Sequence, residues 1–166
     1  MVKTRKGMFE TNSSSTHTII VTDRKTEPGL FVDFSVGQFG WEFKKLDYTN
    51  HKASYLYTMA CAQKHRDVYQ DFYEMLVKYG VQCTCREPAK FDSGYLSNGY
   101  VDHYSDDDAM RFVDRMLNHE HALIKYLFSD ESFIVTGNDN SYDEEREWLH
   151  EQTDVNYPHQ TYYKGN

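Results

Sequence analysis

A long periodic stripe of apolar side chains between Lys52 and Tyr79 limits the folds open to this chain. Apolar residues recur there at steps of three and four, which places them on one face of a helix. Gly80 follows at a position where helices commonly end. The sequence therefore predicts one long helix over 52–79. The stripe consists of Ala53, Leu56, Tyr57, Ala60, Cys61, Val68, Phe72, Met75, Leu76 and Tyr79.

Short segments rich in β-branched and aromatic residues indicate strands elsewhere in the chain. Two further helical patterns follow Ser105, with a break at 118–120, and another follows Ser141. Because helices and strands alternate without a regular βαβ rhythm, we expect an α+β fold, with a mostly antiparallel sheet and three to four helices packed on one face. The segments expected as strands are 7–10, 17–22, 30–34, 37–43, 81–86 and 132–136.

The expected domain organisation is a single α+β domain over residues 1–152, followed by a polar, tyrosine-rich tail over 153–166 that is either loose or wrapped on the body. No apolar segment follows the basic start of the chain, so we expect no secretory signal. No apolar run approaches the roughly 18 residues that a membrane span needs, so we expect no membrane partner.

Net charge and tyrosine content favour a protein partner over a nucleic acid. The formal net charge is −8, which opposes the electrostatic attraction on which ordinary nucleic-acid binding depends. Fourteen tyrosines give many side chains of the type enriched in protein interfaces. Three cysteines form no disulfide framework and fit a reducing compartment. We therefore expect a small acidic binding protein.

The polar segment from Glu10 to His17 is the most conspicuous candidate site. It combines an acid, a base and several short hydroxyls in a connection expected between two strands, where backbone amides and hydroxyls can bind an anion. Candidate catalytic residues in this segment are Glu10, Ser14 and His17. A self-bonded structural turn is the competing interpretation. Candidate ligand-binding residues are Arg5, Thr11, Asn12, Ser13, Ser14 and Ser15.

Two other segments could complete a site across the fold. Asp102 and His103 follow an expected strand and are candidate catalytic residues, although neighbours on a strand point to opposite faces. Asn138, Asp139 and Asn140 are candidate ligand-binding residues in an expected turn.

Other His and Cys pairs do not predict a metal site. His119 and His121 would diverge on a helix, and Cys83 with Cys85 lacks a second cysteine pair at zinc-binding spacing. We therefore expect no metal and no cofactor.

The segment from Arg5 to His17 resembles the start of a protein family encoded by bacteriophages and prophages. The segments 37–42, 52–57 and 132–140 also resemble that family. The resemblance implies a phage or prophage accessory protein acting in the cytoplasm of a bacterial host, and it implies no particular reaction.

Two functions follow from these observations. The first is a binding protein that engages or inhibits a host defence or nucleic-acid-handling protein through an acidic, tyrosine-rich surface. The second is an enzyme or ligand binder that acts on a phosphorylated or nucleotide substrate through Glu10–His17. A convergence of Glu10 and His17 with Asp102 and His103, or with 138–140, in one concave pocket would favour the second.

Overall fold

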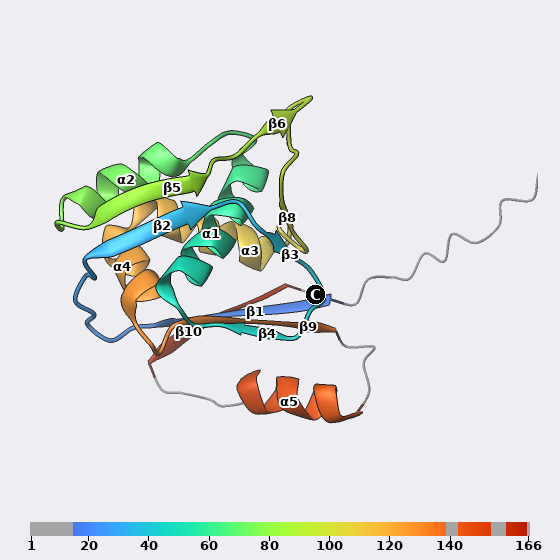
Figure 1. Ribbon diagram of the computed structural model, residues 1–166. Coiled ribbons are helices and arrows are strands. Elements are labelled where there is room, and N and C mark those ends of the chain that lie inside the picture. Colours follow the sequence, from blue (N-terminus) through green and yellow to red (C-terminus); the bar gives the residue numbers. More distant parts are fainter. Residues whose placement is uncertain (1–14, 139–142, 154–158, 166) are drawn as a thin grey trace, which may run out of the picture.

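Strand β1 (Ser15–Thr22) lies inside a four-stranded antiparallel sheet (Figure 1). The computed structural model describes residues 15–138, 143–153 and 159–165. The strand order is β10-β1-β9-β4, in which β4 is Lys44–Leu46, β9 is Phe133–Asn138 and β10 is Gln160–Gly165. β1 pairs with both β9 and β10, so this sheet joins the first described segment of the chain to the last.

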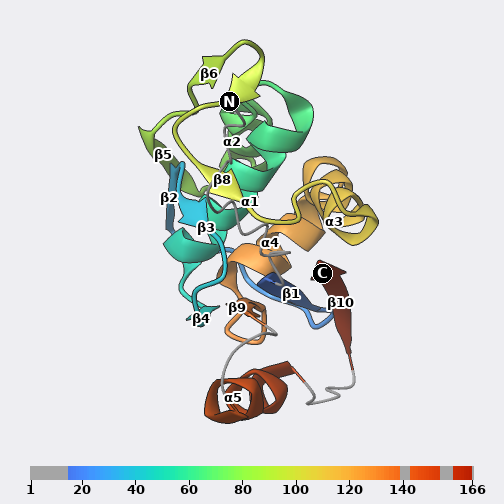
Figure 2. The ribbon, with the colours of Figure 1, turned by 90° about the vertical axis from the view of Figure 1, so that its right-hand side faces the viewer.

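Helices cover the sheet on both faces. One face carries α1 (Thr49–Lys64), α3 (Asp107–Asn118) and α4 (Glu120–Phe128), and α2 (Tyr69–Val77) lies beyond them. Helix α5 (Asp143–Thr153) lies on the opposite face (Figure 2). The α+β class, the antiparallel sheet and the group of helices on one face are confirmed.

Helix α1 is enclosed because a second pair of strands lies on its far side. Strands β2 (Phe31–Ser35) and β5 (Gln82–Glu87) pair in parallel, and β2 packs against α1. Consecutive residues Tyr55, Leu56 and Tyr57 are therefore all buried, as expected of a helix with neighbours all round.

Four further short strands form two pairs. Strand β3 (Gln38–Phe39) pairs in parallel with β8 (Tyr100–Val101), and β6 (Phe91–Asp92) forms a hairpin with β7 (Tyr95–Leu96).

The expected single helix over 52–79 is wrong, because the chain breaks between α1 and α2. His65 adopts a left-handed conformation with φ 51°, and this ends α1. The Asp67 carboxylate then accepts hydrogen bonds from the Tyr69 amide at 2.8 Å and the Tyr57 hydroxyl at 2.9 Å. The apolar pattern continues across the break because both helices pack on the same core.

The segment expected as a tail contributes a strand of the sheet. Residues 160–165 form β10, which pairs with β1 from Thr22 to His17. Tyr163 is buried and packs at 5.4 Å from the Phe112 ring, while its hydroxyl accepts a hydrogen bond from Arg115. Burial of the Tyr163 ring against α3 therefore fixes the position of this otherwise polar segment.

Among the described helices, none has the length and apolar character needed to cross a membrane.

Candidate functional site

Strand β1 carries Ser15 and His17 toward the helices. Alternate residues of a strand share a face, so these two side chains lie on the same side as Ile19 of the main core. Ser15 is 1% exposed and His17 is 2% exposed. The start of β1 therefore places a hydroxyl and an imidazole inside the molecule, where neighbouring polar groups determine what each can do.

His17 is held as a neutral imidazole. Its Nε2 donates a hydrogen bond of 2.8 Å to the Gly40 carbonyl, because that carbonyl can only accept. Its Nδ1 then accepts from the Tyr55 hydroxyl at 2.9 Å. Burial lowers the pKa of His17 below its ordinary value of 6.5. Because both ring nitrogens already have partners, His17 serves as a structural support for the site.

Asp102 and His103 lie in the turn that follows β8. Strand β8 ends at Val101, so the two residues follow the strand and the alternation of faces along a strand does not separate them. His103 has a left-handed backbone with φ 59°, a conformation that side chains other than glycine adopt at a cost. This turn allows both side chains to face the same pocket as His17.

Ser15, His103 and Asp106 form a chain of polar contacts. The Ser15 Oγ lies 2.8 Å from Nε2 of His103, and Nδ1 of the same ring lies 3.4 Å from the Asp106 carboxylate. A carboxylate only accepts, so its contact favours the hydrogen on Nδ1 and leaves Nε2 to accept the serine proton. The order of groups is that of a serine nucleophile, its base and the acid that orients the base.

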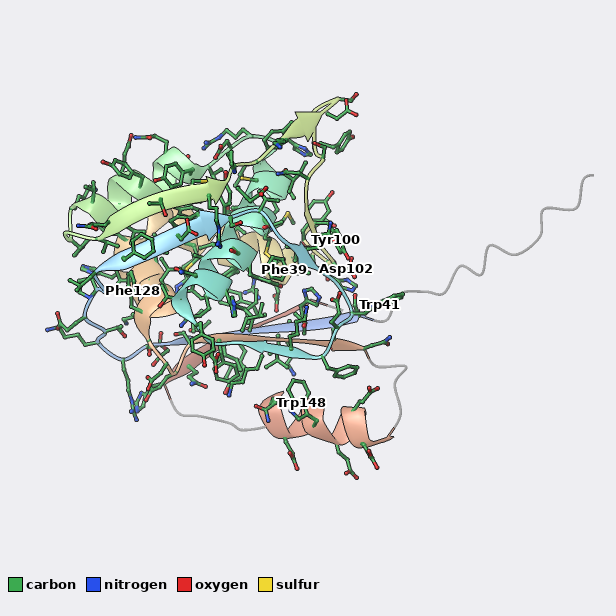
Figure 3. The ribbon with its side chains drawn as sticks, in the orientation of Figure 1. Phe39, Trp41, Tyr100, Asp102, Phe128 and Trp148 are labelled. Carbon is green, nitrogen blue, oxygen red and sulfur yellow. The ribbon has the colours of Figure 1, made fainter. Side chains whose placement is uncertain are left out.

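A small pocket lies between the sheet, α1 and the turn after β8, and His103 is one of the residues that line it. Figure 3 shows Asp102 at this end of the molecule, beside Phe39 and Tyr100. The pocket has room for about one water molecule. Ser15 is connected to the pocket through its hydrogen bond with His103. The lining is His17, Ile19, Tyr55, Met59, Asp102, His103, Ala109 and Tyr163.

The structure brings together several of the residues proposed from the sequence. His17, Asp102 and His103 converge, and Ser15 joins them through His103. Asn138 lies opposite Ser15 in the pairing of β1 with β9. The remaining proposed residues lie outside the described part of the chain, and they are Arg5, Glu10, Thr11, Asn12, Ser13, Ser14, Asp139 and Asn140.

Sequence reasoning missed Asp106 and Tyr55. Asp106 is the residue before α3, a position where an acid also favours the start of a helix. Its spacing of three from His103 was the available signal, since residues at that spacing can meet across a turn. Tyr55 gave no signal, because its contact with His17 joins residues 38 positions apart.

The other His and Cys candidates lie away from this pocket. His119 lies between α3 and α4, and His121 packs against the Tyr79 ring at 5.9 Å. Burial raises the pKa of Cys83 to about 11 and also raises that of Cys85, so both are thiols at neutral pH. Within the described ranges, no three His, Cys, Asp or Glu side chains are grouped closely enough to hold a metal ion.

In comparisons with known proteins, no family model matches the chain, and neither the curated proteins nor the solved structures give a match.

Proposed function

We propose that the protein is an enzyme that uses Ser15 as a nucleophile in acyl transfer or ester hydrolysis. The observation that carries the proposal is the 2.8 Å contact of the Ser15 Oγ with His103, whose other nitrogen faces Asp106. The convergence of His17, Asp102 and His103 in one pocket supports an enzyme over a binding protein without a site.

Each residue has a defined role in this proposal. The Ser15 Oγ attacks the substrate carbonyl carbon, and its proton passes to Nε2 of His103. The protonated ring then donates that proton to the leaving alcohol or amine, which leaves an acyl group on Ser15. Water attacks the acyl group while His103 again accepts a proton, and free serine and a carboxylic acid result. Asp106 stabilises the charged imidazole and holds its orientation.

The described part of the pocket lining favours an acyl group over a phosphate. Among the described residues, the lining includes the Asp102 carboxylate and neither lysine nor arginine, whereas phosphate sites usually supply cationic donors. Because Ser15 is buried and the pocket has room for about one water, a substrate reaches the Oγ only after a neighbouring segment moves. We therefore expect slow turnover in the absence of the natural substrate.

A fluorophosphonate probe, which reacts with activated serines, tests the proposal. We expect covalent labelling at Ser15, located by peptide mass spectrometry, and at least a tenfold slower rate in Asp106→Asn, which keeps the side-chain shape but removes the charge. Ser15→Ala and His103→Ala should abolish labelling, while His119→Ala should label normally. Equal labelling of wild type and Ser15→Ala would overturn the assignment. So would the absence of labelling in both proteins, if wild type also hydrolyses no ester in a panel of activated esters.

A second proposal rests on the molecular surface. Tyr48 is 72% exposed and Tyr95 is 65% exposed, and the chain carries a net charge of −8. These features support an accessory protein that engages or inhibits a basic host protein, as the resemblance to phage and prophage proteins implies, in a bacterial cytoplasm. The test is copurification from bacterial lysate at low and high salt. A partner retained by wild type and lost by Tyr48→Ser or Tyr95→Ser supports it, and a lysate that yields no such partner contradicts it.

A further inference from the structure

The Tyr100 ring and the Asp102 carboxylate both lie close to the backbone at Gly40. A Cβ added to Gly40 would lie 3.4 Å from the Tyr100 hydroxyl and 3.3 Å from an Asp102 carboxylate oxygen. The carbonyl of the same glycine accepts the hydrogen bond from His17. The Tyr100 ring and the Asp102 carboxylate therefore both lie beside Gly40, and Asp102 also lines the pocket that contains His103.

Trp41 follows Gly40 directly and is 57% exposed, while Tyr100 is 45% exposed. Figure 3 shows Trp41, Tyr100 and Asp102 on the same side of the molecule. We call these three residues the aromatic rim. Large aromatic side chains lose favourable burial when they are left in water, and grouped exposed aromatics commonly mark a binding surface.

The charge at the aromatic rim is negative. Asp102 is half-buried, and within the described part of the chain its carboxylate has no hydrogen bond or ion pair. Glu42 lies beside it, since its carboxylate accepts a hydrogen bond of 3.3 Å from the Gly40 amide. Asp102 and Glu42 both favour a positive charge on the neighbouring His17. A half-buried carboxylate without a counterion is suited to a cation supplied by a ligand.

We propose that the aromatic rim binds a cationic group of the substrate, with a guanidinium or ammonium held between the Trp41 and Tyr100 rings and the Asp102 carboxylate. Aromatic faces attract such cations, and arginine also stacks on them. The substrate class is then an ester or amide of a basic peptide or amine. Its description as a substrate subsite rests on the proposed function of Ser15, whereas the binding of a cation does not.

Tryptophan fluorescence can test this directly. The chain has two tryptophans, so Trp148→Phe leaves Trp41 as the single reporter. We add Ser15→Ala to remove the proposed chemistry. Titration with N-acetyl-arginine amide should give a saturable change in Trp41 emission. N-acetyl-citrulline amide, which has nearly the same shape without the charge, should bind at least tenfold more weakly.

Substitutions at the aromatic rim supply the control. Asp102→Asn and Tyr100→Leu should each weaken arginine binding at least fivefold, and Tyr73→Leu on α2 should leave it unchanged. Equal responses to arginine and citrulline probes, or binding that neither rim substitution alters, would overturn the inference. These outcomes are separate from the probe labelling of Ser15, because they are measured in a protein that lacks the serine.

Discussion

The His17 imidazole and the Tyr55 hydroxyl, on β1 and α1, are joined by a hydrogen bond of 2.9 Å inside the core. Burial raises the pKa of Tyr55 well above its usual range, so its hydroxyl remains a donor. The other His17 nitrogen reaches the Gly40 carbonyl. One side chain thus connects the sheet, helix α1 and the loop that carries Trp41.

Removing the Tyr55 hydroxyl should therefore destabilise the protein. In Tyr55→Phe the His17 Nδ1 remains buried without a donor, which costs about 1–3 kcal/mol. The measurement is the free energy of unfolding from urea denaturation. Tyr48→Phe is the matched control, because Tyr48 is 72% exposed and should change stability by less than about 0.5 kcal/mol. Equal effects of the two substitutions would show that the buried hydrogen bond contributes little.

The lowered pKa of His17 predicts a loss of stability in mild acid. Below about pH 6.5 the unfolded chain binds a proton at this position while the folded chain resists it, so stability falls as pH decreases toward the folded pKa. His17→Gln, whose amide can also donate and accept, should show a shallower decline between about pH 7 and 5. Parallel curves for wild type and variant would contradict this assignment. NMR titration of the His17 ring checks the same point directly.

The fold was largely open to prediction because its apolar patterns are local. Segments such as 30–34 and 132–136 correspond closely to β2 and β9. The break at His65 was missed because the apolar period is the same on either side of it. Strand β10 was missed because its polar sequence gains its structure from pairing with β1, 138 or more positions away along the chain.

The site was predictable only in its parts. Ser15, His17, Asp102 and His103 could be proposed from their chemistry, but nothing local indicates that residues 88 positions apart share a hydrogen bond. The left-handed conformation of His103 was equally hidden, since it depends on how the turn after β8 packs. The role proposed for Ser15 thus depends on a tertiary contact with His103.

Gly99 should be essential for the position of this turn. A Cβ added there would lie 2.3 Å from the Gly37 carbonyl oxygen and 2.3 Å from a Val36 methyl group, so β8 could not stay beside β3. We expect Gly99→Ala to cost about 1–3 kcal/mol, the range for overpacked sites, and to slow labelling of Ser15. Ser105→Ala, exposed in the same turn, should do neither. A thermal melt and the probe assay together check this, and normal labelling in Gly99→Ala would contradict the proposed dependence.

Lys52 provides a prediction in mild alkali. Lys52 is 1% exposed, and its ammonium group donates to the carbonyls of Ser129 and Ser132 at 2.6 and 2.9 Å, just after α4. Burial lowers the pKa of this lysine from 10.5 to about 8. Between these two pH values the unfolded chain holds a proton that the folded chain has released, so this group makes the protein more stable as pH rises.

The comparison with Lys52→Met isolates that effect, because the other titrating groups are common to both proteins. From pH 8 to 10.5 the free energy of unfolding of wild type should rise relative to the variant by up to about 3 kcal/mol. Urea denaturation at several pH values measures the difference. A constant difference across this range would show that Lys52 keeps its proton in the folded state, and that its two carbonyl hydrogen bonds outweigh the cost of burying the charge.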